Sequence, residues 1–188
     1  MVYNSRIIYF MTYQQVIDRY YPPETLRRVI YMRHCEAVAQ LALEIAEKKA
    51  LPLERDEIRE AAMLHDIGIF LTDAPDIDCH GEEPYIMHGV LGGKLIRSEG
   101  LREEYARVAE RHTGAGISDE DITNQSLPLP PGQYMPETLL ERLVCYADKF
   151  YSKSGDMKRK SLDRVVASMK RISDSTLDRF MALHAEFE

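Results

Sequence analysis

Polar residues interrupt the apolar stripes of several predicted helices. Four of them, each on a different helix, fall on the face that the apolar spacing assigns to the core: His34, His65, His112 and Asp148. His65, for example, lies four residues after Ala61 and seven after Ile58, and residues at these spacings share one face of a helix. Asp66 follows directly in the same apolar run, "AAMLHDIGIF". A buried carboxylate is costly unless something compensates its charge.

A bound metal ion explains this pattern better than four separate structural roles. One inward histidine is more often a satisfied core residue, and one inward aspartate more often caps a helix or pairs with arginine. The recurrence on four helices favours a shared site. Imidazole and carboxylate groups are suitable ligands for divalent ions such as Fe, Mn, Zn or Mg, and an ion would compensate Asp66.

These residues carry a family resemblance. The order His34, then His65 with Asp66, then Asp148 resembles the H…HD…D signature of the HD-domain metal-dependent phosphohydrolases, whose common local form is "HDIG", here residues 65–68. "MHGVLGGKLI" and "ERHTGAG" resemble the segments that supply two further histidines in branches with two metals, including the symmetrical dinucleoside-tetraphosphate hydrolases. The resemblance covers residues 30–153.

The resemblance implies a ligand for each position. His34, His65, Asp66 and Asp148 would hold a first ion, and Asp66 would bridge to a second ion held by His88 and His112. His88 lies near a predicted helix start, so a capping or surface role is its alternative. The implied cofactors are one or two divalent ions per chain (Fe, Mn, Co, Ni, Zn or Mg), with Fe or Mn favoured. His80 and His184 are expected to have no role in the site.

The implied reaction is hydrolysis of a small phosphorylated metabolite, a nucleotide in the first instance, by attack of metal-activated water at phosphorus. Asp66 and His65 would be the catalytic residues. One position departs from many relatives, because Ile69 stands where a phosphate-binding lysine often follows HDIG. Two alternatives use the same ligands: a di-iron oxygenase of the HD fold and a regulator that binds metal or nucleotide without turnover.

A cation for the substrate phosphate must therefore come from another segment. The candidates lie near ligand positions in the sequence and are Arg111, Lys149, Lys94 and Arg33, with Lys153 also close. Lys149 and Arg111 are each adjacent to a predicted ligand, and each could equally lie on the outer side of its helix.

Helical periodicity is strong along the chain and strand signals are weak, so the predicted fold class is all-α, a compact helical bundle like that of HD domains. Helices are expected over 23–49, 54–68, 86–98, 101–113, 136–153, 160–171 and 174–187, with a short one capped by Ser118 and Asp121. Pro23 and Pro136 are expected in first turns, and Gly68 just past a helix end. The segments 70–85 and 113–137 are predicted to be loops.

A single domain is expected, with an N-terminal extension and short helix (1–22), a metal-binding part (23–153) and C-terminal helices packed on it (154–188).

Composition narrows the class of partner. The chain has 188 residues and a formal net charge of −7, which disfavours a nucleic-acid polymer as partner because such binding depends on Lys and Arg. The three cysteines form no CxxC pair, and no segment is long and apolar enough for a membrane span or signal peptide. We therefore expect a cytoplasmic protein without membrane association. Met11 is a possible alternative start, and the pattern does not indicate an oligomeric state.

Overall fold

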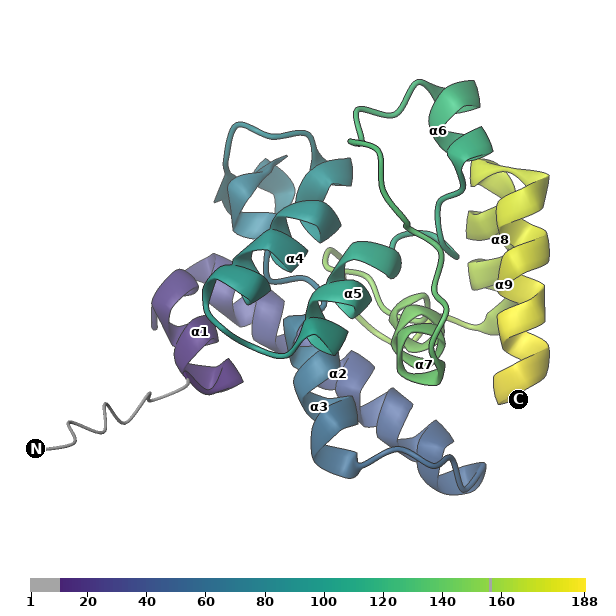
Figure 1. Cartoon of the computed structure of the whole chain (residues 1–188), viewed down its shortest axis with the longest axis horizontal. Coiled ribbons are helices and arrows are strands. Elements are labelled where there is room, and N and C mark those ends of the chain that lie inside the picture. Colours follow the sequence, from purple (N-terminus) through teal and green to yellow (C-terminus); the bar gives the residue numbers. More distant parts are fainter. Residues whose placement is uncertain (1–10, 156) are drawn as a thin grey trace, which may run out of the picture.

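Helices account for most of the described chain, which confirms the all-α prediction. The computed structural model describes residues 11–155 and 157–188. Three pairs of consecutive helices pack together: α2 (Leu26–Lys48) with α3 (Arg55–Leu64), α4 (His88–Ser98) with α5 (Glu103–Arg111), and α8 (Leu162–Ile172) with α9 (Asp174–Phe187). α7 (Leu139–Asp148) contacts α2, α3, α5 and α9, and Figure 1 shows it nearly end-on between α5 and the α8–α9 pair. α1 (Tyr13–Tyr20) packs on α3, and α6 (Asp119–Gln125) lies in the long connection before α7.

One apolar core joins all of these helices except α6, whose Ile122 packs on a separate small cluster. The core extends from Val16 on α1 to Phe187 at the end of α9. Phe180 connects the C-terminal pair to the rest, because its ring lies 5.7 Å from that of Tyr146 and 6.3 Å from that of Phe150. The core thus includes residues from the N-terminal part, the metal-binding part and the C-terminal part expected from the sequence. The boundaries between these parts, at residues 23 and 153, stay a prediction. The three cysteines are buried and unpaired.

Two helices begin later than their prolines suggested. α2 starts at Leu26 because the Thr25 side chain accepts a hydrogen bond from the Arg28 amide. α7 likewise starts at Leu139, with Thr138 as its N-cap. A capping hydroxyl satisfies an amide that a helix start leaves free, so the threonines and not Pro23 and Pro136 mark the first turns.

The helix expected over 54–68 ends at Leu64 instead. Residues 65–68 form turns, in which the Ile67 amide donates a hydrogen bond to the Leu64 carbonyl at 3.0 Å. The Tyr21 hydroxyl donates a hydrogen bond to the Ile67 carbonyl at 3.2 Å. Gly68 has a φ of −82°, so it is not a left-handed cap. Its role is close approach: a Cβ atom there would lie 2.3 Å from the His88 carbonyl oxygen and 2.4 Å from the Gly92 amide nitrogen.

The predicted loops contain short ordered elements. Residues 70–85 hold a two-stranded antiparallel sheet, β1 (Asp73–Ala74) with β2 (Cys79–His80), in which Asp73 pairs with His80. Turns of 3₁₀ helix at Ile69–Leu71, Pro75–Ile77 and Tyr85–Met87 complete this segment. The capping box of Ser118 and Asp121 is present at the start of α6, as predicted.

Among the described residues, no helix has the length and apolarity needed to span a membrane.

Candidate metal centre

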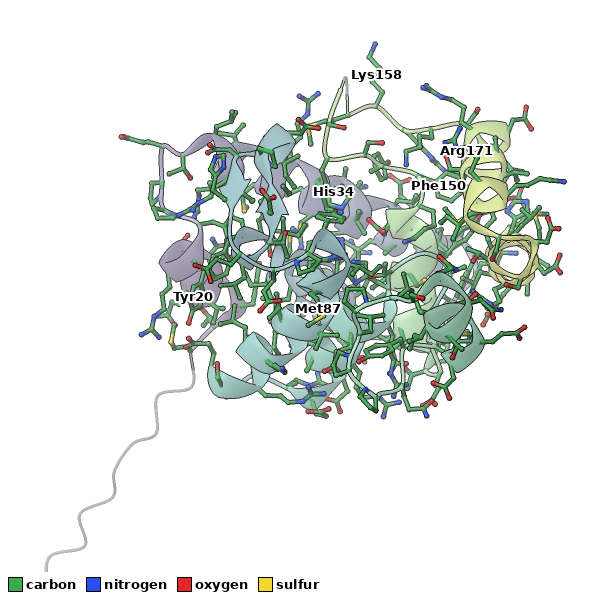
Figure 2. The ribbon with its side chains drawn as sticks, turned by 90° about the horizontal axis from the view of Figure 1, so that it is seen from above. Tyr20, His34, Met87, Phe150, Lys158 and Arg171 are labelled. Carbon is green, nitrogen blue, oxygen red and sulfur yellow. The ribbon has the colours of Figure 1, made fainter. Side chains whose placement is uncertain are left out.

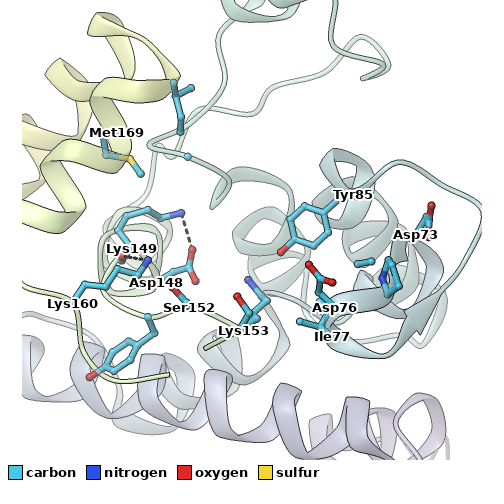
Figure 3. Close-up of a pocket in the computed structure, with 16 residues that line it drawn as sticks. Asp73, Asp76, Ile77, Tyr85, Asp148, Lys149, Ser152, Lys153, Lys160 and Met169 are labelled. Carbon is cyan, nitrogen blue, oxygen red and sulfur yellow. Dashed lines mark hydrogen bonds and ion pairs between the residues drawn. The ribbon is translucent and has the colours of Figure 1, made fainter. Parts of the chain in front are cut away.

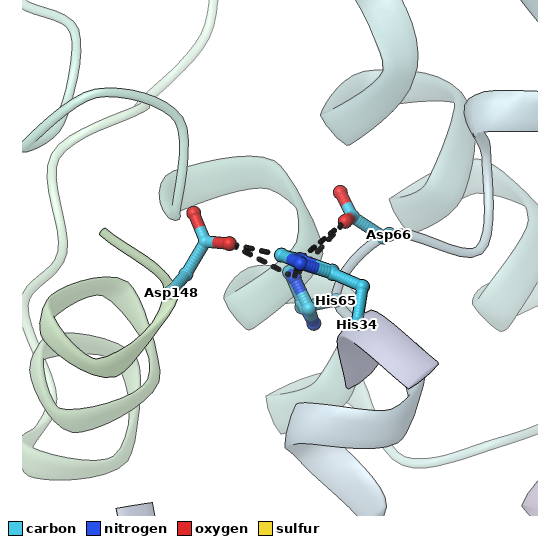
Figure 4. A group of neighbouring side chains, drawn as sticks. All are labelled: His34, His65, Asp66 and Asp148. Carbon is cyan, nitrogen blue, oxygen red and sulfur yellow. Dashed lines mark hydrogen bonds and ion pairs between the residues drawn. The ribbon is translucent and has the colours of Figure 1, made fainter. Parts of the chain in front are cut away.

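Four buried side chains from three helical segments meet in a first cluster. His34 lies in the middle of α2, His65 and Asp66 directly follow α3, and Asp148 is the last residue of α7. His34 Nε2 lies 3.1 Å from Asp66 Oδ2, 3.0 Å from Asp148 Oδ1 and 3.2 Å from His65 Nε2. Figure 4 shows the two carboxylates on opposite sides of the two imidazole rings. The structure thus brings together the four residues predicted for the first ion.

A second cluster shares Asp66. Its Oδ1 atom lies 3.2 Å from His112 Nε2 and 3.5 Å from His88 Nε2, and these two nitrogens are 3.1 Å apart. Asp66 therefore directs one oxygen to each cluster. His88 is the first residue of α4, yet no side chain caps that helix, and its ring is turned inward to the cluster.

Backbone carbonyls orient three of the rings. The Nδ1 atoms of His65, His88 and His112 each lie 2.6–2.8 Å from the carbonyl oxygen of the residue three positions earlier. A carbonyl only accepts hydrogen bonds, so Nδ1 carries a proton. In His88 and His112, whose pKa values are lowered by burial, the ring is neutral and presents a lone pair at Nε2. This is the arrangement that metal-binding histidines use. In His88 and His112 two such lone pairs face each other at 3.1 Å, which requires a cation or an extra proton between them.

The spacing of the donor atoms fits a shared ion. Metal–ligand bonds of about 2.1 Å place neighbouring ligand atoms roughly 3.0–3.4 Å apart in octahedral or tetrahedral geometry. The Nε2–oxygen and Nε2–Nε2 separations in the two clusters are 3.0–3.5 Å. Both groups fit divalent ions, in agreement with the residue types that the sequence indicated.

Charges within the clusters are strongly coupled. Burial opposes ionisation of Asp66, but His65 and Lys153 outweigh burial and hold the pKa of Asp66 well below its usual range. Burial also opposes protonation of His65, and Asp66 reverses this effect, so the pKa of His65 is raised. His88 differs, since burial and the neighbouring His112 lower its pKa to about 3. His88 is thus neutral at pH 7, as a ligand must be.

Two lysines from the segment after α7 reach the clusters. Lys153 Nζ lies 2.7 Å from Asp66 Oδ2. Lys149 Nζ lies 2.7 Å from Asp148 Oδ2 and donates a hydrogen bond to the His112 carbonyl at 2.8 Å. Both are substantially buried, so their charges are little screened.

An open cleft of about 560 Å³ lies above the first cluster. Asp148, Lys149 and Lys153 line it in the centre, with Tyr85 and the 73–77 segment on one side and Lys160 and Met169 on the other (Figure 3). A ligand in this cleft can therefore reach the carboxylate and the ammonium groups together.

Of the four basic residues predicted to bind the substrate phosphate, only one lies in the cleft. Lys149 lines the cleft. The Arg111 guanidinium is held 2.7 Å from Glu137 and 3.0 Å from Glu141, two carboxylates at the start of α7. Lys94 on α4 and Arg33 on α2 are exposed. The structure thus gives Arg111 structural partners and brings the lysines after α7 to the clusters.

Two residues of the cleft were missed from the sequence. The Tyr85 ring stacks on His88 with centroids 4.7 Å apart, and its position three residues before a histidine predicted as a ligand was an available signal. Lys160 donates a hydrogen bond to the Lys149 carbonyl at 3.0 Å, a contact that no local pattern predicts. His80 is exposed, as expected.

Comparisons with known proteins agree with this geometry. The family model described as HD domain matches residues 31–152. An uncharacterised protein of Methanocaldococcus jannaschii is 36% identical over 143 residues, 74% of this chain and 75% of that protein. Two proteins named tRNA (cytidine(56)-2'-O)-methyltransferase, from Picrophilus torridus and Thermoplasma volcanium, are 32% identical over 84% and 81% of this chain. The match covers only 41% and 40% of their own lengths.

A solved structure supports the fold. The HD domain of the L. monocytogenes phosphodiesterase PgpH aligns with a TM-score of 0.54 at 13% identity, covering 91% of this chain and 94% of that chain. At this identity the similarity concerns the fold.

Proposed function

Because this chain belongs to the HD domain family, we propose that it is a metal-dependent phosphohydrolase acting on a small phosphorylated metabolite, with nucleotides as the first class to test. The observation that carries the proposal is the position of Asp66, which faces two histidine clusters with its two oxygens beneath a cleft that contains lysines. A binding protein needs no such shared carboxylate.

The two clusters could each hold one ion. His34, His65, Asp66 Oδ2 and Asp148 would hold the first, and Asp66 Oδ1, His88 and His112 the second. When bound, divalent ions in such a site lower the pKa of a bound water to about 7 and polarise phosphoryl oxygens. Fe and Mn suit this set of nitrogen and oxygen donors.

The protein itself would bind and orient the phosphate. Lys149 and Lys153 place their ammonium groups beside Asp148 and Asp66 at the base of the cleft, where they can hold phosphate oxygens against the ligand clusters. Two aspartates neutralise only half the charge of two divalent ions, so the site stays positive in an acidic protein. This charge attracts phosphate, and the acidic remainder of the surface repels long polyanions.

The two lysines can replace the phosphate-binding lysine that many relatives have at the position of Ile69. That side chain is buried in a small apolar cluster with Ile77 and Cys79, so it leaves no cation after HDIG. Lys149 and Lys153 supply positive charge from another segment, which supports phosphate chemistry over the di-iron oxygenase that the ligand set alone also permits.

Elemental analysis of the purified protein, combined with phosphate release from a panel of nucleotides, tests the proposal. We expect close to two ions per chain and release of phosphate that depends on them. Asp66→Ala should lose metal and activity together, whereas His80→Ala, which changes an exposed histidine outside the clusters, should lose neither. Oxygen consumption on substrate addition without phosphate release would refute the hydrolase and favour the oxygenase. Full metal and activity in Asp66→Ala would refute the site.

A further inference from the structure

A second, strongly basic groove adjoins the cleft. Its volume is about 540 Å³. It is formed by the segment between α7 and α8 and by α8 itself, and its described lining includes Ser152, Ser154, Lys158, Lys160, Arg164 and Arg171. Four of these residues are cationic, and the lining as described contains no carboxylate. We call this surface the basic groove.

The arginines of the groove lie along one face of α8. Arg164, Ser168 and Arg171 follow a spacing of four and three residues, which aligns them on a helix, and the Arg171 guanidinium donates a hydrogen bond to the Ser168 hydroxyl at 3.1 Å. Figure 2 shows Arg171 on α8 and Lys158 on the preceding segment at the same end of the molecule.

Among the residues that the structure describes, 11–155 and 157–188, Arg164 and Arg171 form no ion pair. Arg97 on α4 differs, because it is held by Glu103 and Glu110. The protein has 31 acidic residues and 24 lysines and arginines. Within the described residues, two arginines without ion pairs on one face of α8, in such an acidic chain, indicate a site for an anion.

The basic groove continues into the cleft. Ser152, Ser154 and Lys160 line both cavities, so one ligand can extend from the clusters to the arginines. Ligand sites for small molecules commonly measure about 300–1,000 Å³, and the groove lies in this range. It lies largely outside the segment matched by the HD domain model, residues 31–152, and is therefore a feature of this chain's C-terminal part.

We propose that the basic groove binds a second phosphate group of the substrate, so that the preferred substrates are small molecules with two phosphate groups, one of which is positioned at the metal centre. This inference rests on the proposed function. Arg164 and Arg171 would bind the distal phosphate through charge-assisted hydrogen bonds, and Lys149 and Lys153 the phosphate that reacts.

Alkylene diphosphonates of increasing chain length test the inference without turnover, because their P–C bonds are not hydrolysed. Calorimetry compares each one with the alkyl monophosphonate of the same length on the native, metal-containing protein. At the chain length that spans both cavities, the diphosphonate should bind about tenfold or more tightly. Equal affinities at every length would overturn the inference.

Matched double variants locate the effect. Arg164→Gln/Arg171→Gln should remove the preference for the diphosphonate and change monophosphonate binding less than about twofold. Arg55→Gln/Arg59→Gln removes two exposed arginines from α3 and should keep the preference. A preference that survives in the first variant, or disappears in both, contradicts the assignment.

Two further results separate this inference from its alternatives. An RNA oligonucleotide that binds more tightly than every diphosphonate at physiological salt, and loses affinity in the α8 variant, would replace the small-molecule ligand with a nucleic acid. Diphosphonate binding as expected, without phosphate release from any substrate, would refute the proposed hydrolase and leave the basic groove in place.

Discussion

Replacing Gly68 with alanine should damage the second cluster and spare the first. The new Cβ would lie 2.3 Å from the His88 carbonyl oxygen and 2.4 Å from the Gly92 amide nitrogen. Non-bonded contacts of this kind are favourable only at about 3.5 Å or more, so α4 must move outward by about 1 Å. His88 is carried by α4, and its Nε2 atom would move relative to His112, from which it is now 3.1 Å distant.

The expected consequence is specific. Metal content should fall from about two ions to about one per chain, and kcat/KM by about 100-fold, the usual effect of a 1 Å displacement in a catalytic site. Overpacking should also lower the free energy of unfolding by about 1–3 kcal/mol. Elemental analysis, steady-state kinetics and urea unfolding measure the three quantities.

Gly93→Ala is the matched control. The three atoms nearest to its Cβ would all belong to the Glu110 side chain, 2.6 Å away at the closest. That side chain is partly exposed and ion-paired with Arg97, and we expect it to rotate, at the cost of this pair, without moving α4. We expect it to keep both ions and its activity. If Gly68→Ala also keeps two ions and full activity, the close approach of residues 65–68 to α4 does not position His88, and the reasoning fails.

Three other perturbations test separate parts of the structure. Glu141→Ala should lower the free energy of unfolding by about 1–3 kcal/mol, measured in urea, because the buried Arg111 guanidinium loses the more buried of its two carboxylate partners and keeps only the exposed Glu137; a loss below about 1 kcal/mol would contradict this. Burial raises the pKa of Asp121, but hydrogen bonds from Ser118 and the charge of Arg179 lower it overall, so its stabilisation is present above an unfolded pKa of about 3.9 and is lost as pH falls further. The difference in unfolding free energy between the native protein and Asp121→Asn should therefore shrink below about pH 4, and a constant difference would refute it. Removal of bound metal with a chelator should lower the melting temperature of the native protein, since ions at 100 times their Kd contribute about 2.7 kcal/mol; Asp66→Ala should show no such shift, and an equal shift in both would place the stabilising ions elsewhere.

The sequence by itself determined the fold class and the inward residues. Helical periodicity assigned His34, His65, His112 and Asp148 to buried faces because the spacing of apolar neighbours defines each face locally. The buried face of a helix can be predicted from its own sequence, without knowing which helix packs against it, so these predictions could be made residue by residue. The predicted helix ends were less accurate, since Thr25 and Thr138 cap two helices that Pro23 and Pro136 were expected to start.

Only the tertiary structure decided what those faces meet. Arg111 and Lys149 both adjoin a predicted ligand in the sequence, yet Arg111 contacts the Glu141 carboxylate of α7 and Lys149 lines the cleft. Gly68 was expected to end a helix and instead allows α4 to approach closely. These outcomes depend on contacts between segments far apart in the chain. The packing of whole helices determines such contacts, so a local sequence pattern cannot predict them.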